Sequence, residues 1–159
     1  MIMLRRLRDG DIALFKKWLD TPHVAKWYHN PLDWIEEIEK QDSDFCWIHH
    51  FIVEYDGKPI GFCQYYKYED SGEAWHGNVG TRDTYSIDYM IGELEFIGKG
   101  FGRHLVRALI SKVWMEEKAK CVIVQPEPEN KASCKTLLSC GFKFDNENKV
   151  YIKFCNQHI

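Results

Sequence analysis

The sequence predicts a single α/β domain over residues 1–159, in which helices cover a mixed β-sheet. Three observations support this prediction. Runs rich in β-forming residues alternate with amphipathic runs along the whole chain. The pair Asp56-Gly57 joins two neighbouring β-rich runs, which is typical of an antiparallel hairpin. A glycine-rich turn separates a further β-rich run from a long amphipathic helix.

The first 40 residues predict one strand and two helices. Residues 2–8 favour a short strand. Asp9 or Asp11 can cap a helix over residues 12–19, which carries apolar residues on one face. The segment "DTPHVAKWYHNP" ends that helix, and residues 32–40 predict a second one.

The middle of the chain predicts a hairpin over residues 47–68, a polar loop over 69–83 and a strand over 84–91. A long helix is expected over residues 100–118, because apolar residues recur there at every fourth position.

The last 40 residues predict a buried strand, a helix and a closing hairpin. The apolar run 121–125 is typical of a central buried strand. Asn130 or Ser133 begins the final helix, and Gly141 ends it. Residues 142–154 predict the hairpin.

Composition narrows the function classes. The formal charge is −3 and no Lys/Arg run occurs, so we expect no nucleic-acid partner. The N-terminus lacks the apolar core of a signal peptide, and no window is long enough to cross a membrane. The cysteines form no C-x-x-C pair, which favours buried free thiols and a cytoplasmic location. These are Cys46, Cys63, Cys121, Cys134, Cys140 and Cys155.

No metal site is expected from the histidines. His49 and His50 are adjacent on a predicted strand and therefore point to opposite faces. The other histidines lack the spacing of metal ligands.

The stretch "EFIGKGFGRHLVRALI" (95–110) places Gly98, Gly100 and Gly102 at the start of a helix. The first turn of a helix has unpaired N–H groups and a partial positive charge, and glycine lets the backbone approach an anion closely. Lys99 and Arg103 add positive charge. We therefore predict that this loop binds a phosphate group; the alternative is that the glycines only make a tight turn.

Neither common nucleotide motif fits the loop. A Walker A loop needs a Lys followed by Ser or Thr, but Gly100 follows Lys99. A dinucleotide fingerprint that starts at Gly98 would need a glycine at Arg103, and one that starts at Gly100 would need it at Leu105.

The motif "IGKGFGRHLVRALI" resembles the acetyl-CoA pyrophosphate loop of the GNAT superfamily of N-acetyltransferases. The family pattern is [Q/R]-x-x-G-x-[G/A], which Gly100 and Gly102 match, whereas Ile97 stands at the Gln/Arg position. "PEPEN…LLSCGFKF" is similar to the family's second signature. The resemblance covers nearly the whole chain and implies a central mixed, mostly antiparallel sheet flanked by helices.

The resemblance implies acetyl-CoA as co-substrate and gives a set of residues that bind it. Asn130 matches the position that contacts the pantetheine arm, and the backbone of the strand end runs beside that arm. The implied residues are Met90, Ile91, Gly92, Gly98, Lys99, Gly100, Phe101, Gly102, Arg103 and Asn130.

Asp88 is the candidate catalytic residue. An aspartate within the apolar run "SIDYMIG" is costly if it is buried without a partner. A carboxylate beside the attacking amine can take its proton, and Asp88 matches the aspartate of the "G-I-D" segment in aminoglycoside 6'-N-acetyltransferases. The alternative is an aspartate at the strand edge that faces solvent.

The acceptor-binding candidates are aromatic or polar. Gln64 and Tyr66 alternate on a predicted strand and share a face, while Trp27 and Tyr28 follow the first helix. Trp75 lies in the polar loop that also carries Glu69, Asp70 and Glu73. An aromatic and acidic pocket suits a polycationic amine. Core packing for the aromatics and a solvated surface for the loop acids are the alternatives.

One position departs from the family. Many of its members carry a tyrosine seven residues after the asparagine, and this tyrosine protonates the leaving thiolate; Leu137 stands there in this chain. Water, or another hydroxyl such as that of Tyr151, would have to supply the proton.

"LFKKWLDTPHVAKWY", "GKPIGFCQYY", "SIDYMIG" and "PEPEN" are most similar to aminoglycoside 6'-N-acetyltransferases. Siderophore-type lysine acyltransferases and ribosomal-protein acetyltransferases share parts of the pattern. We therefore expect acetyl transfer to a primary amine of a small polycationic acceptor. A polyamine, a lysine-type siderophore precursor, a protein N-terminus, or a CoA-binding module without catalysis are the alternatives. Similar folds often form a homodimer, which the sequence does not decide.

Overall fold

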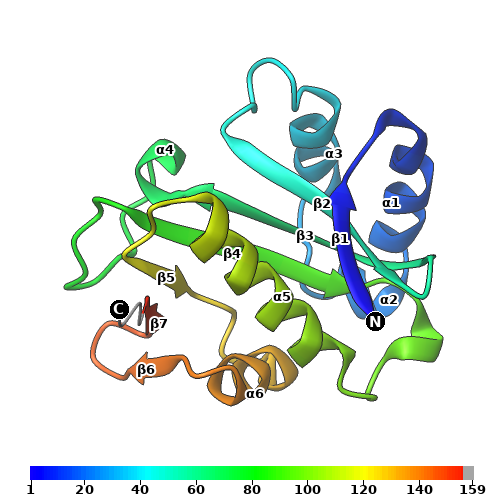
Figure 1. The fold of residues 1–159 in the computed structure, drawn as a ribbon. Helices are drawn as coiled ribbons and strands as arrows, with labels where there is room; N and C mark the ends of the chain where they lie inside the picture. The colour runs from blue at the N-terminus through cyan, green and yellow to red at the C-terminus, as the bar shows by residue number, and fades with distance from the viewer. Residues whose placement is uncertain (156–159) are drawn as a thin grey trace.

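The computed structural model describes residues 1–155, and its elements follow the expected order (Figure 1). The strands are β1 (Ile2–Arg6), β2 (Ile48–Tyr55), β3 (Lys58–Lys67), β4 (Thr84–Ile91), β5 (Cys121–Val124), β6 (Lys143–Asp145) and β7 (Val150–Phe154). The α-helices are α1 (Ile12–Leu19), α2 (Pro22–Ala25), α3 (Pro31–Glu39), α4 (Tyr68–Ser71), α5 (Phe101–Glu116) and α6 (Lys131–Ser139). The 3-10 turns are η1 (Asp9–Asp11) and η2 (Leu94–Phe96).

The strands form one sheet in the order β1-β2-β3-β4-β5-β7-β6. Every pair of neighbours is antiparallel except β4 and β5, which run parallel. The helix α5 makes the crossover between these two strands, as a parallel connection requires. The expected mixed, mostly antiparallel sheet is therefore confirmed.

The strands β4 and β5 pair over only a few residues and then separate. Thr84–Ser86 pair with Cys121–Ile123, and β5 then ends at Val124 while β4 continues to Ile91. On its other side β4 stays paired with β3 along its length. The second half of β4 thus has no strand partner on the β5 side. The Ile91 carbonyl pairs there with the His23 ring over 3.0 Å, and the other outward-facing backbone groups of this half lack a strand partner.

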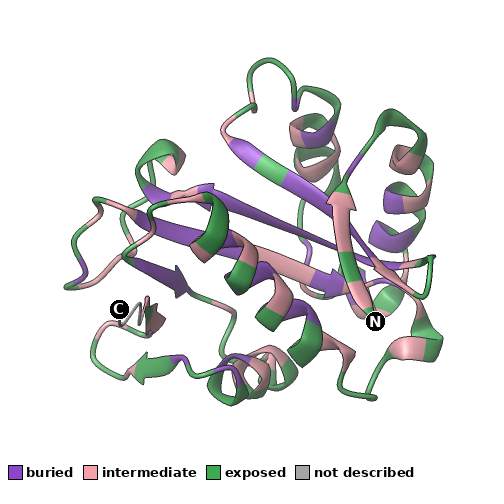
Figure 2. Ribbon diagram, in the orientation of Figure 1, coloured by how far each residue is buried: buried purple, intermediate pink, exposed green. Residues whose placement is uncertain are grey.

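Helices cover both faces of the sheet (Figures 1 and 2). The buried side chains of residues 1–155 form three clusters, and the two largest are a core with α5 and a core with α1. The alternation of side chains along a strand assigns neighbouring residues to opposite cores. On β3, Cys63 packs with α5 residues such as Leu105, while Phe62 packs with α1 residues such as Trp18. On β4, Met90 belongs to the α1 core and Tyr89 packs against the α5 core.

Several local expectations need correction. The segment between the first two predicted helices contains the short helix α2, and the predicted polar loop begins with α4. Neither Asp9 nor Asp11 caps α1 with its side chain; the Asp11 carboxylate instead binds Arg5 through two hydrogen bonds of 2.8 Å. Cys46 is exposed, so the thiols are not all buried. No helix among residues 1–155 is long and apolar enough to span a membrane.

Candidate active site

Two adjoining cavities open beside the free half of β4. The first, here called the acidic cavity, has a volume of about 490 Å³ and lies between α3, β3, β4 and the segment after β5. The second, the glycine-loop cavity, has a volume of about 590 Å³ and lies between β4, α5 and α6. Both are lined by the same five residues at their junction: Trp27, Tyr28, Tyr89, Asn130 and Ser133. Two ligands, one in each cavity, would meet there.

The two cavities carry opposite charge. Among the described residues, the acidic cavity is lined by four carboxylates and by no Lys or Arg: Glu37, Glu73, Asp88 and Glu127. The glycine-loop cavity is lined by Arg103 and Lys135 and by no Asp or Glu of residues 1–155. The first cavity therefore attracts a cation and the second an anion.

The glycine loop leads into the start of α5, where backbone N–H groups are unpaired. Gly98 and Gly100 have φ angles of 74° and 84°, a conformation that glycine adopts without strain. Gly100 begins α5 without a side-chain cap, and the N–H groups of the first helical turn find no acceptor among the described residues. A phosphate group at this point would satisfy them.

Most of the residues expected to bind the acyl donor line the glycine-loop cavity. These are Met90, Ile91, Gly98, Gly100, Phe101, Gly102, Arg103 and Asn130. Lys99 is exposed and does not line it.

Gly92 also lies outside the cavity lining, and packing explains the glycine. Its N–H donates to the Ile60 carbonyl over 2.8 Å. A Cβ atom there would lie 2.3 Å from the ring of Trp18. Gly92 therefore allows α1 to pack against the end of β4.

Asn130 begins α6 and faces both cavities. Its side-chain oxygen accepts a hydrogen bond of 3.2 Å from the Ser133 N–H, which leaves the amide NH₂ group free for a ligand.

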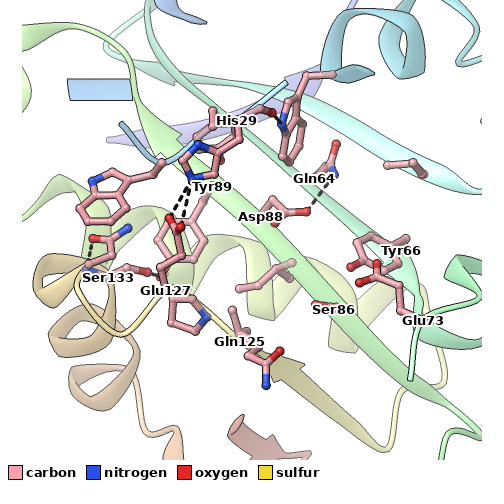
Figure 3. A pocket seen from close by; sticks show the side chains of 18 of the residues that line it. His29, Gln64, Tyr66, Glu73, Ser86, Asp88, Tyr89, Gln125, Glu127 and Ser133 are labelled. Atoms are coloured by element: carbon pink, nitrogen blue, oxygen red, sulfur yellow. Dashed lines mark hydrogen bonds and ion pairs between the residues drawn. The ribbon is translucent and has the colours of Figure 1, made fainter. Parts of the chain in front are cut away.

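Asp88 projects from β4 into the acidic cavity, where the Gln64 side chain donates a hydrogen bond of 2.9 Å to its carboxylate (Figure 3). Burial raises the pKa of Asp88 to about 6, although the hydrogen bond from Gln64 acts in the opposite direction. A carboxylate with this pKa is charged at neutral pH and is a stronger base than a solvated aspartate. It can take a proton from a bound ammonium group directly or through water.

All six residues expected to bind the acceptor line the acidic cavity: Trp27, Tyr28, Gln64, Tyr66, Trp75 and Asp88. The Trp75 indole N–H donates to the Glu73 carboxylate over 2.7 Å, so the aromatic ring and the acid lie together. Of the three acids in this loop, Glu73 lines the cavity, whereas Glu69 and Asp70 do not.

The sequence reasoning missed two further acids of this cavity. Glu37 comes from α3, and burial, followed by the negative charge of Asp88, raises its pKa to about 7. Its place three residues after Trp34 puts it near the inner face of the helix, but a charged residue on a helix is usually solvated, so no clear signal in the sequence marks it. Glu127 follows β5 and pairs with His29 over 3.0 Å, which links two segments distant in sequence across the cavity mouth.

The sequence reasoning also missed a hydroxyl pair at the cavity junction. The hydroxyls of Tyr89 and Ser133 lie 2.6 Å apart and connect β4 to α6 (Figure 3). Leu137 is fully buried in the α5 core. Tyr151 packs against Phe144 and lines neither cavity, so its hydroxyl does not reach the junction.

Behind Asp88, a row of polar residues crosses the sheet. His50, Gln64 and Asp88 stand in register on β2, β3 and β4. His50 is 2% exposed, and burial lowers its pKa to about 4. Neither ring nitrogen of His50 has a hydrogen-bond partner, and neither does the side-chain oxygen of Gln64. His50 is therefore neutral at physiological pH.

No metal site is formed by the described residues: no group of three or more His, Cys, Asp or Glu side chains lies close enough to hold an ion.

The comparison with solved structures defines the class of fold, which is that of the N-acetyltransferases. The crystal structure of aminoglycoside acetyltransferase AAC(6')-Ib with coenzyme A and kanamycin is 22% identical and matches with a TM-score of 0.83, over 97% of this chain and 95% of that one. The aminoglycoside N(6')acetyltransferase of Legionella pneumophila is 18% identical with a TM-score of 0.73, over 91% and 81%. The type 1 aminoglycoside N(6')-acetyltransferase of Klebsiella pneumoniae is 24% identical over 148 residues, 89% of this chain and 74% of that protein.

The chain belongs to the GNAT acetyltransferase family, because the family model "Acetyltransferase (GNAT) domain" matches residues 8–150. The expected fold and the enzyme class, an acetyltransferase, are thereby confirmed.

Proposed function

We propose that this protein transfers the acetyl group of acetyl-CoA to a primary amine of an aminoglycoside-type polycation. The opposite charge of the two adjoining cavities carries the proposal. A ligand with phosphate groups suits the basic glycine-loop cavity, and a polycationic amine suits the acidic cavity. The similar proteins named above are acetyltransferases of aminoglycosides, which supports the same acceptor class here.

The donor fits the residues present. The unpaired N–H groups at the start of α5 would hold the pyrophosphate, and Arg103 would add a positive charge beside it. The free amide group of Asn130 and the unpaired edge of β4 would hold the pantetheine arm. The thioester would then lie at the junction of the two cavities.

The acceptor amine would lie beside Asp88. As the ammonium group enters, Asp88 takes its proton, and the neutral amine attacks the thioester carbonyl. Trp75 and the other aromatic rings of the cavity stabilise the remaining ammonium groups through cation–π contacts, and the other carboxylates do so by charge. A rival base is Glu37, whose raised pKa gives it similar strength.

The test is the release of CoA thiol from acetyl-CoA with a panel of amines: kanamycin-type aminoglycosides, spermidine, lysine derivatives and short peptides. We expect saturable turnover with aminoglycosides. A matched aminoglycoside with a hydroxyl in place of the 6'-amine should bind without being acetylated. Turnover with peptides or spermidine alone would refute the acceptor assignment. Binding of acetyl-CoA without turnover of any amine would favour a binding module.

We further propose that residues 1–159 act as one domain, since a single sheet joins the first and last strands. The unpaired thiols and the use of acetyl-CoA support a cytoplasmic location. A homodimer stays a prediction, which sedimentation would test.

A further inference from the structure

Acetyl transfer leaves a thiolate at the junction of the two cavities, and the departure of this thiolate is easier if a group nearby donates a proton to the sulfur. The question rests on the function proposed above. Leu137 is apolar and 0% exposed, so this position of α6 supplies no proton. Three residues shared by the two cavities carry a hydroxyl: Tyr28, Tyr89 and Ser133.

The geometry of α6 singles out one of these hydroxyls. Ser133 and Leu137 are four residues apart and lie on the same face of the helix. Side chains of a helix lean toward its N-terminus, so a long side chain at position 137 would extend toward Ser133. Tyr89 places its own hydroxyl 2.6 Å from the Ser133 hydroxyl, from the opposite side of the gap. The phenol of β4 therefore reaches the place that a tyrosine at Leu137 would reach from α6.

Tyr28 is the weaker candidate because it lies on the acceptor side. It packs in the α1 core against Trp34, with the ring centroids 4.6 Å apart. The charge of Asp88 also acts on its hydroxyl. Tyr89 packs instead against the α5 core, on the side of the glycine loop.

We propose that Tyr89 is a catalytic residue that donates a proton to the CoA sulfur, in place of a hydroxyl on α6. The amine nitrogen forms a bond to the acetyl carbon, and the C–S bond breaks with its electron pair going to sulfur. The Tyr89 O–H proton moves to that sulfur and gives the free thiol. Asp88 already holds the proton of the ammonium group, so the second proton of the acetylated nitrogen passes to solvent in the cavity. Ser133 relays a proton from solvent to the Tyr89 phenolate.

The surroundings of Tyr89 suit this role. Burial raises the pKa of the phenol, so Tyr89 stays protonated over the whole working range of the enzyme. The same burial raises the pKa of a thiol held at this point, so it affects donor and acceptor alike, while the hydrogen bond with Ser133 acts to lower the pKa of the phenol.

The experiment compares Tyr89→Phe with Tyr85→Phe, a matched control on the same strand. The Tyr85 hydroxyl donates to Glu117 over 3.1 Å and lines neither cavity. The first measurement is the titration of the thiol of bound CoA, followed by ultraviolet absorbance of the thiolate. If Tyr89 donates to the sulfur, Tyr89→Phe should raise the pKa of this thiol by about one unit, a tenfold change in its acidity. Tyr85→Phe should leave it unchanged.

The second measurement is turnover. Tyr89→Phe should lower kcat about 100-fold and leave the KM for the amine within about twofold, because the proton is donated only as the C–S bond breaks. Ser133→Ala should lower kcat less, since solvent can replace the relay. A thiol pKa and kcat within about twofold of wild type in Tyr89→Phe would overturn the proposal. Full loss of turnover in Ser133→Ala, with no loss of turnover in Tyr89→Phe, would also overturn the proposal.

The outcome separates this inference from the proposed function. Failure of the wild-type protein to bind CoA would overturn both. A thiol pKa that shifts in Tyr89→Phe, in a protein that acetylates no aminoglycoside, would support the contact with sulfur and refute the acceptor alone.

Discussion

Replacement of Asp88 by Asn is expected to slow acetyl transfer and to stabilise the fold at neutral pH. The carboxylate lies in a site that disfavours its charge, and burial raises its pKa from 3.8 to about 6. A shift of about two units corresponds to roughly 3 kcal/mol of penalty on the charged form. Water in the open cavity solvates part of that charge, so the expected gain in Asp88→Asn is about 1 to 3 kcal/mol at pH 8. Asn keeps the oxygen that accepts from Gln64.

The gain should depend on pH in a defined direction. Because the folded-state pKa of Asp88 is raised, the native protein binds more protons than the unfolded chain between pH 3.8 and about 6. The stability of the wild-type protein relative to Asp88→Asn is therefore greatest below pH 3.8 and falls as the pH rises through 6. The advantage of the variant should be absent near pH 4, grow between pH 4 and about pH 6, and be complete above pH 6.

The rate of acetyl transfer should fall in Asp88→Asn, whereas the stability of the variant at neutral pH rises. Loss of a general base lowers turnover by about 100- to 10,000-fold. In the wild-type protein, kcat/KM should fall tenfold per unit below about pH 6, as Asp88 becomes protonated.

The assay pairs urea unfolding at pH 4 and pH 8 with thiol release from acetyl-CoA. Asp44→Asn is the matched control, because the Asp44 side chain is 71% exposed and lines neither cavity. A stability gain of equal size at both pH values would refute burial as its cause. A kcat/KM within threefold of wild type would refute Asp88 as the base and point to Glu37.

Three other changes test the surroundings of the site. Burial lowers the pKa of His50 from 6.5 to about 4, so between these pH values the unfolded chain binds one proton more than the folded protein. The unfolding free energy of wild type should therefore fall by about 3 kcal/mol as the pH falls from 6.5 to 4. His50→Phe should not show this fall in urea unfolding. Gly92→Ala places a methyl group 2.3 Å from the Trp18 ring, so calorimetry should show a loss of about 3 kcal/mol or more; an unchanged melting temperature would contradict this packing. Glu127→Gln, which removes a negative charge from the acidic cavity, should raise the KM of a polycationic acceptor about two- to fivefold at low salt. The exposed contact with His29 contributes little, so the unfolding free energy should stay within about 0.5 kcal/mol. An effect on KM that persists in high salt would argue against charge as its origin.

Patterns local in the sequence predicted the fold well. The strand Thr84–Ile91 and the helix Ile12–Leu19 have the predicted bounds, because alternation and apolar spacing are strong there. The pair Asp56-Gly57 forms the predicted turn, with positive φ at both residues. The short helices α2 and α4 were missed, since four residues are too few to set a periodic pattern.

The site was predicted less completely than the fold. Asp88 stood out because it interrupts an apolar run. Glu37 and Glu127 did not, because charged residues on a helix or in a loop are usually solvated, and only the packing of α3 and the segment after β5 turns them toward one cavity. Gly92 was expected to bind the donor, but packing explains this glycine, because a Cβ atom there would overlap the Trp18 ring.

The strand β4 explains how one short segment can serve two ligands of opposite charge. Consecutive residues of a strand point to opposite faces, so Asp88 faces the acidic cavity on the α1 side while Tyr89 packs toward α5. If β5 stayed paired with β4 along its whole length, it would fill the space beside Tyr89. The two side chains would then lie on separate faces of a closed sheet. Because β5 ends at Val124, Tyr89 reaches the junction where both cavities meet. A base on one face and a proton donor at the gap can then act on one thioester held beside the unpaired edge of β4. A substitution that lengthened the β4–β5 pairing should therefore abolish CoA binding and acetyl transfer together.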